Sequence, residues 1–177
     1  SYSAHDCSSL SAKDHSSLSA WNFSSMSARD FSSLSTRNHS SLSAGSSSSL
    51  SAQGCSSLSA QNFSYLSARD YSSLSAQNHS SMSAQDYSSL SAQFFSSLSA
   101  GKNSVISAIN SIAKAGLGSI ITLAKVDDDD IVDFKAGIVD GVNILPDVWY
   151  KVENGEFVEV SDEELKQYGP GGESREF

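Results

Sequence analysis

A unit of eight residues, Ser-Ser-Leu-Ser-Ala followed by three variable residues, repeats from Ser8 to about Ala108. Its apolar member never loses phase: it is Leu10, Leu18, Met26, Leu34, Leu42, Leu50, Leu58, Leu66, Leu74, Met82, Leu90, Leu98 and Ile106. A unit this short cannot enclose a core, so its copies must stack on one another, which is the organisation of a solenoid.

Strand alternation divides the five constant residues between two faces. In one unit, Ser56, Leu58 and Ala60 then point inward, whereas Ser57 and Ser59 point outward. A helix is excluded, because a period of eight drifts by about 80° per repeat at 3.6 residues per turn. Two units, one on each side of a thin core, make a coil, so we expect an all-β fold: a two-sided β-solenoid with 16 residues per coil and about six to seven coils.

The three variable residues supply the corner between units. In most units the middle one is Asn, Asp or Gly, which tolerate a left-handed backbone, so we expect this position to turn the chain. The inward Ser at the first position is a polar group in a thin core. Its hydroxyl can bond to backbone groups beside the corner, which predicts a ladder of identical Ser residues along the solenoid. The alternative, a disordered Ser-rich segment, does not explain the unbroken Leu phase.

The octad phase slips after Ala108, and the outward position becomes apolar at Val105, Ile112 and Ile120. We therefore expect these last coils to be covered by the segment that follows. That segment contains strand-like stretches at 131–139, 148–152 and 157–160. A solenoid needs such a cap, because its last coil otherwise exposes unpaired backbone and core.

Two local signals organise the C-terminal region. Asn154-Gly155 is the strongest short signal for a hairpin, and it joins the last two expected strands. Ser161 and Glu164 form a capping box that opens a short helix through about Tyr168. The domains expected are therefore an octapeptide solenoid over 1–125, a β-rich cap with a short helix over 126–168, and a disordered tail over 169–177.

The units resemble the repeats of bacterial ice nucleation proteins, which also pair two octads per 16 residues. The match is Ser-Ser-Leu-Ser-Ala, as at Ser72 to Ala76, and it covers about 100 of the 177 residues. The resemblance implies a β-solenoid whose outward rows organise water into ice-like order. Here the outward rows are Ser-x-Ser, without the Thr methyl groups of the family. The stretch from Gly118 to Val160 is similar to the end region of uncharacterised phage and bacterial repeat proteins, a likeness that implies no activity.

Charge is unevenly distributed along the chain. The 11 Lys+Arg and 20 Asp+Glu give a net charge of −9. Residues 1–125 hold seven bases and five acids, net +2, and the remainder holds four bases and fifteen acids, net −11. A nucleic-acid partner would need a basic stripe, and membrane insertion would need a long apolar run. We expect neither, and no signal-peptide or lipidation pattern is present.

The two cysteines, Cys7 and Cys55, occupy the same octad position on one edge of the solenoid. They are three coils apart, about 14 Å at the spacing of neighbouring strands. A disulfide requires Cα atoms within about 7 Å. We therefore expect free thiols, which favour a reducing compartment such as the cytoplasm or a virion.

Candidate metal and catalytic sites are weak. Asp127 to Asp130 could bind a hard cation such as calcium, but the segment lacks the Gly and Glu spacing of a known loop, so a solvated turn is favoured. His15, His39 and His79 lie at corners on different edges or several coils apart, so no metal site is expected. No nucleophile elbow is present, and identical Ser residues cannot single out one nucleophile. We expect no enzyme activity and no cofactor.

Two surfaces remain as candidate sites. An outward Ser face is represented by Ser57, Ser59, Ser73, Ser75, Ser89 and Ser91. The last octad position forms two edge columns, with Phe23, Tyr71 and Tyr87 on one and Phe31, Phe63 and Phe95 on the other. These aromatic residues either cover the corners by stacking or form a side-by-side interface between solenoids.

The surfaces lead to three hypotheses about function. The first is a non-enzymatic structural rod that forms homo-oligomers through its edges or end to end, since Ser1 to Ala12 shows no capping element. The second is an ice- or water-organising protein that uses the outward Ser rows. The third is a fragment of a phage or cell-surface fibre.

Overall fold

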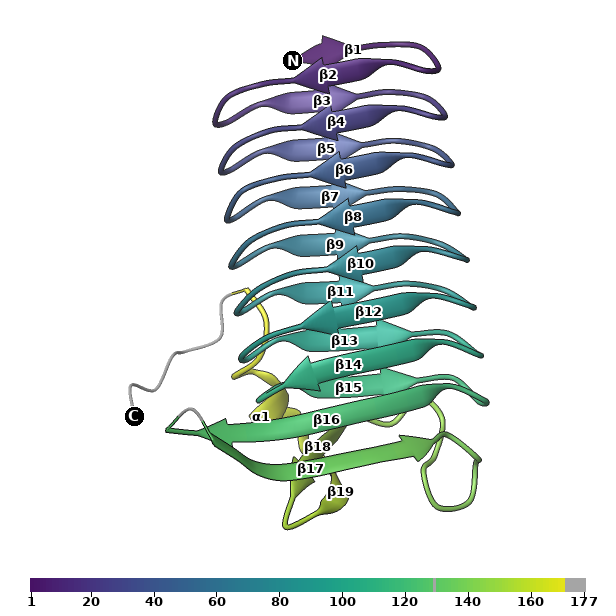
Figure 1. Ribbon diagram of the computed structural model, residues 1–177, viewed down its shortest axis with the longest axis vertical. Helices are drawn as coiled ribbons and strands as arrows, with labels where there is room; N and C mark the ends of the chain where they lie inside the picture. Colours follow the sequence, from purple (N-terminus) through teal and green to yellow (C-terminus); the bar gives the residue numbers. More distant parts are fainter. Residues whose placement is uncertain (129, 171–177) are drawn as a thin grey trace.

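The chain folds as the predicted β-solenoid (Figure 1). The computed structural model describes residues 1–128 and 130–170. It has about eight turns with a 16-residue repeat, and one short helix lies near the C-terminus. The described residues form two sheets, of ten and nine strands. There are more turns than the six to seven predicted, because coils continue past the slip in octad phase.

Successive strands alternate between the two sheets. Sheet A contains, in spatial order, β1 (Tyr2–Ser3), β3 (Ser17–Ser19), β5 (Ser33–Ser35), β7 (Ser49–Ser51), β9 (Tyr65–Ser67), β11 (Ser81–Ser83), β13 (Ser97–Ala100), β15 (Ile112–Ala115), β18 (Tyr150–Glu153) and β19 (Glu156–Glu159). Sheet B contains β2 (Ser9–Ser11), β4 (Ser25–Ser27), β6 (Ser41–Ser43), β8 (Ser57–Ser59), β10 (Ser73–Ser75), β12 (Ser89–Ala92), β14 (Val105–Ile109), β16 (Ile120–Asp127) and β17 (Asp130–Ile138).

The repeat strands pair in parallel and in register, so each side chain lies over its equivalent in the next coil. Leu74 lies between Leu58 and Leu90, and it is 1% exposed. The adjacent Ser73 and Ser75 are exposed. The predicted inward and outward residues are therefore confirmed. The core is one cluster made of two rows of Leu, Met and Ile side chains, one row from each sheet, with Ala beside them.

The chain turns at a different residue from the one predicted. Backbone φ is positive at the last octad position in every unit from Cys7 to Asn103, with values of 53–57°. The middle position has no positive φ in these units, so the prediction of a left-handed residue there is wrong.

At the middle position, Asn and Asp instead use their side-chain oxygens to accept hydrogen bonds from the backbone of the next coil. Asn22 N donates to Asp6 Oδ1 at 2.8 Å, one coil away. In the same way Gly54 N donates to Asn38 Oδ1, also at 2.8 Å. On the other edge Asn78 N donates to Asn62 Oδ1 at 3.0 Å. These bonds satisfy corner N–H groups that have no partner within a strand ladder, and they join successive coils at both edges.

The predicted ladder of inward serines is confirmed. Ser64 N donates to Ser80 Oγ at 3.3 Å, and Ser80 Oγ in turn donates to the backbone oxygen of Gln61 at 3.2 Å. The ladder survives the slip in phase, since Ser96 N donates at 3.0 Å to the hydroxyl of Ser111, one residue nearer than the usual repeat. The hydroxyl therefore replaces the backbone acceptor that a corner cannot supply.

A cap of antiparallel strands covers the last coil. β17 pairs antiparallel with β16, and β18 pairs antiparallel with β15, so in both sheets the strand that follows the last coil is reversed. In sheet A the hairpin partner β19 then follows β18 at the edge of the sheet. The predicted hairpin at Asn154-Gly155 joins β18 to β19. The short helix α1 (Asp162–Leu165) begins at the predicted capping box on Ser161, but it ends before the predicted Tyr168. No helix in the described part of the chain is long and apolar enough to cross a membrane.

Coverage of the last coils differs between the two sheets. On sheet A, Ile112 is completely buried. On sheet B, Val105 and Ile120 are 46% and 43% exposed, so the prediction that these outward positions are covered is wrong for this sheet. The described residues beyond α1, which end at Pro170, return along sheet A, not sheet B (Figure 1).

Candidate functional site

Aromatic rings stack along both edges of the solenoid. We define column 1 as the last octad residues that precede sheet B: Cys7, Phe23, His39, Cys55, Tyr71 and Tyr87. Column 2 contains the equivalent residues that precede sheet A: His15, Phe31, Ser47, Phe63, His79 and Phe95. In column 1 the Tyr71 and Tyr87 ring centroids lie 5.1 Å apart, with an angle of 5° between the ring planes. In column 2 the centroids of Phe63 and His79 lie 5.0 Å apart.

The left-handed backbone at these positions has an energetic cost that stacking offsets. A non-Gly residue in this conformation costs about 1–2 kcal/mol. A stacked aromatic pair contributes about 0.5–1.5 kcal/mol beyond its buried area. The two terms are similar in size, so the columns provide a structural reason for aromatic residues at the corner. Their role as an interface stays a prediction.

The C-terminal segment covers the end of column 2. The ring of Tyr168 lies 6.4 Å from that of Phe95, and Gly169 N donates to the backbone oxygen of Phe95 at 2.8 Å. Tyr65 Oη donates to the backbone oxygen of Pro170 at 3.0 Å. Burial raises the pKa of the Tyr168 phenol. The tail was predicted to be disordered over 169–177; its first two residues are bonded to the solenoid, and 171–177 lie outside the described residues.

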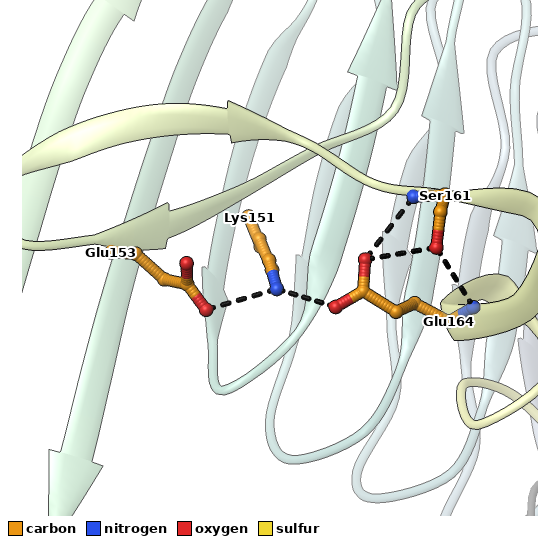
Figure 2. Close-up of polar contacts among 4 residues, drawn as sticks. All are labelled: Lys151, Glu153, Ser161 and Glu164. Carbon is orange, nitrogen blue, oxygen red and sulfur yellow. Dashed lines mark hydrogen bonds and ion pairs between the residues drawn. The ribbon is translucent and has the colours of Figure 1, made fainter.

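A charged cluster holds this segment in place (Figure 2). Lys151 Nζ lies 2.9 Å from Glu153 Oε1 and 2.6 Å from Glu164 Oε1, which connects β18 to α1. Burial alone would lower the pKa of Lys151, but the bonds to Glu164 and Glu153 outweigh it and the pKa is raised. The bond from Lys151, with that from the Ser161 backbone, lowers the pKa of Glu164.

Column 1 is open along its length. A groove of about 1130 Å³ runs beside it, between the rings and the outward Ser column of sheet B. Phe23, Tyr71 and Tyr87 are 60%, 63% and 52% exposed, although each ring stacks on a neighbouring ring of the column. Because the ring faces point along the solenoid, toward the next coil, the ring edges are what column 1 presents to solvent. An apolar ridge beside a groove is suited to contact with another surface.

The predicted Ser face lies on sheet B. Its members Ser57 and Ser59, Ser73 and Ser75, and Ser89 and Ser91 occupy β8, β10 and β12 in direct register and are all exposed. Sheet A is less regular, because Tyr65 replaces a Ser and Gly169 lies against Ser97 and Ser81. The structure therefore distinguishes the two faces, which the repeat alone could not do.

An apolar patch interrupts sheet B near the cap. Register places Ile120 between Val105 and Ile138, and Phe134 beside Ala124, all on the outward side. Ile138 and Phe134 are 59% and 55% exposed. The sequence signalled this patch through its apolar outward positions, but the patch is not covered by described residues.

The other candidate groups are scattered. Cys7 and Cys55 are exposed free thiols on column 1. Within residues 1–128 and 130–170, no group of three or more His, Cys, Asp or Glu could hold a metal ion. The suggested cation site at Asp127 to Asp130 includes residue 129, which lies outside the described residues; its flanking residues Asp127 and Asp130 pair across β16 and β17.

Comparisons with known proteins found no match: no protein-family model, no curated protein and no solved structure matches the chain.

Proposed function

We propose that this chain is a non-enzymatic structural rod that assembles side by side with other copies through its aromatic edges. The observation that supports the proposal is the open state of column 1, where Phe23, Tyr71 and Tyr87 remain more than half exposed beside a groove. Exposed apolar surface of this extent marks sites of contact with other protein surfaces.

Charge and end structure favour contact through the edges. The shaft of residues 1–125 carries a net charge of only +2, so two shafts can approach closely. The C-terminal end carries a net charge of −11 over 126–177, and in both sheets a reversed strand follows the last coil. Strand-on-strand stacking at that end would bring two acidic caps together, whereas lateral contact between antiparallel copies avoids this cost.

Sedimentation velocity over a range of concentrations tests the proposal. The chain should form larger species as its concentration rises, and a variant without the column 1 rings should remain monomeric. Asn is the suitable replacement, because it tolerates the left-handed backbone and so removes the ring while preserving the corner. The variant carries Phe23→Asn, Tyr71→Asn and Tyr87→Asn.

A matched control changes the same number of exposed corner residues at a different octad position. Gln61→Ser, Gln77→Ser and Gln93→Ser together should leave association unchanged. Equal association of the column 1 variant, the control and the unmodified chain would contradict the proposal. Monomeric behaviour of the unmodified chain at every concentration would contradict it as well.

A second candidate function is organisation of water or ice by the Ser face of sheet B. It is favoured by the in-register exposed hydroxyls of β8, β10 and β12, which repeat about every 4.8 Å from coil to coil. Ser lacks the methyl group and the rotamer restriction of Thr, which makes the grid less rigid. Ice-affinity partition separates the candidates: water organisation predicts enrichment in slowly grown ice, lost with Ser57→Lys and Ser73→Lys but retained in the column 1 variant.

A further inference from the structure

We infer that two copies of this chain pair antiparallel along column 1, with Cys55 of each copy beside the two-fold axis. The inference rests on the proposed edge assembly and adds to it the edge, the orientation and the register.

The edge is selected by the groove beside column 1 and by the partial cover of column 2. Column 2 ends under Tyr168 and Gly169 of the same chain, and the described C-terminal segment runs on to Tyr65. Column 1 has no such cover among the described residues, and the long groove follows it from Phe23 to Asn103. Phe31 and Phe63 of column 2 are still 59% and 47% exposed, so the cover there is limited to the end near Phe95. The groove that follows column 1 is therefore what makes this edge the one on which a second copy fits.

The shape of this edge is suited to a self-complementary contact. The ridge of column 1 lies directly beside the groove, so the ridge of each copy can occupy the groove of the other, which is the arrangement of a two-fold interface. The lining contains Ser, aromatic residues, His39, Cys55, Asn103 and Val105, with no Lys, Arg, Asp or Glu among the described residues. No charged side chain must lose its hydration when two such surfaces meet.

The orientation follows from the charge distribution. Parallel pairing would place two caps, each of net charge −11, side by side. Antiparallel pairing separates them by the length of the paired column, about 29 Å for six coil spacings. That distance is more than three times the Debye length of about 8 Å at physiological salt, so the repulsion between caps is screened.

The register follows from the extent of the column. The left-handed corner positions on this edge run from Cys7 to Asn103 at intervals of one coil, and Cys55 is the central one. Full overlap of two antiparallel edges over these seven positions, which are column 1 and Asn103, therefore places Cys55 against Cys55 of the partner copy. It also places His39 against Tyr71 of the partner copy, and Phe23 against Tyr87 of the partner copy.

Cysteine cross-linking in solution tests all three features, because the column contains two exposed thiols at different distances from the axis. The two chains to compare are Cys7→Ser, which retains Cys55, and Cys55→Ser, which retains Cys7. Serine is accepted at this position, as Ser47 shows with the same backbone conformation. The probe is a short bis-maleimide, applied at a concentration where sedimentation shows association.

The inference predicts that the chain retaining Cys55 is cross-linked to a dimer and the chain retaining Cys7 is not. In the antiparallel pair the two Cys7 thiols are six coils apart, about 29 Å, beyond the reach of the reagent. Adding Tyr71→Asn and Tyr87→Asn to the Cys55 chain should abolish its cross-linking. Adding Phe31→Asn and Phe63→Asn, on column 2, should leave the cross-linking unchanged.

Each other outcome overturns the inference in a recognisable way. Equal cross-linking through Cys7 and Cys55 would mean parallel pairing, and edge assembly would still stand. Association without cross-linking through Cys55 would place the interface elsewhere. Absence of association in sedimentation would remove both the inference and the proposed function.

Discussion

Replacing one inward serine by alanine should destabilise the solenoid much more than replacing an outward serine of the same unit. Ser80 is fully buried, and its Oγ accepts the hydrogen bond of Ser64 N at 3.3 Å. Ser80→Ala leaves that buried N–H without its acceptor, which costs about 1–3 kcal/mol. Ser83 lies in the same octad unit, on strand β11, but is exposed, so Ser83→Ala should change the free energy of unfolding by less than about 0.5 kcal/mol.

Urea unfolding followed by circular dichroism measures the difference between the two variants. Amide hydrogen exchange adds a local test, because repeat proteins are stabilised mainly by contacts between neighbouring coils. In Ser80→Ala the amide of Ser64 should exchange faster, whereas amides several coils away should keep their protection. Equal unfolding midpoints for the two variants, with unchanged exchange at Ser64, would refute the idea that the serine ladder connects the coils.

Three further predictions concern the corners and the cap. Ser47→Gly should raise the thermal midpoint of unfolding, because Gly adopts the left-handed backbone of this position without steric strain. After the entropy cost of Gly, the free energy of unfolding should rise by about 0.5–1 kcal/mol. Ser47→Val should lower the midpoint, because a β-branched residue is strained in this conformation. Ser46→Asn should add the side-chain acceptor missing from its corner and stabilise the chain by about 1 kcal/mol in urea unfolding; an unchanged midpoint would contradict the corner ladder. The pKa of Glu164 is lowered in the fold, so its contribution is complete above the ordinary pKa of 4.5 and is lost as the pH falls through the lowered value. In a Trp21→Phe background, Trp149 fluorescence should therefore report loosening of the cap at a higher pH than circular dichroism reports loss of the shaft; coincident transitions would be the contrary result.

The parts of the fold that depend on period could be predicted from the sequence. A shift of one residue would turn every Leu to the solvent side, so the constant phase from Leu10 to Ile106 determines both the faces and the register. The serine ladder follows from the same constancy, because a polar group in a thin core needs a partner. The hairpin and the capping box are local signals and were correctly located.

The left-handed position could not be predicted in the same way. Propensity favours Asn and Asp for this conformation, and Asn22 and Asp30 are at the middle position. Their side chains, however, serve bonds to the next coil, which are contacts between residues 16 positions apart. Once these bonds are made, the turn falls on the following residue, whatever its intrinsic preference.

The choice between the two edges also depends on non-local contacts. The sequence located both aromatic columns from spacing alone. It did not signal that Tyr168 and Gly169 would return to Phe95, because no period or motif relates these segments. The exposure of the patch at Val105 and Ile120 was predicted wrongly for a related reason: apolar outward residues indicate a cover, but not whether this chain supplies it.

Small-angle X-ray scattering over a concentration series tests the central claim most directly, because it separates growth in width from growth in length. A rod that assembles through column 1 should gain cross-sectional radius as concentration rises, while its maximum dimension grows only by the overhanging caps. The column 1 Asn variant should keep the cross-section of a single solenoid. Growth in length at constant cross-section, or the same widening in that variant, would contradict the claim that this chain is a rod that assembles by its open aromatic edge.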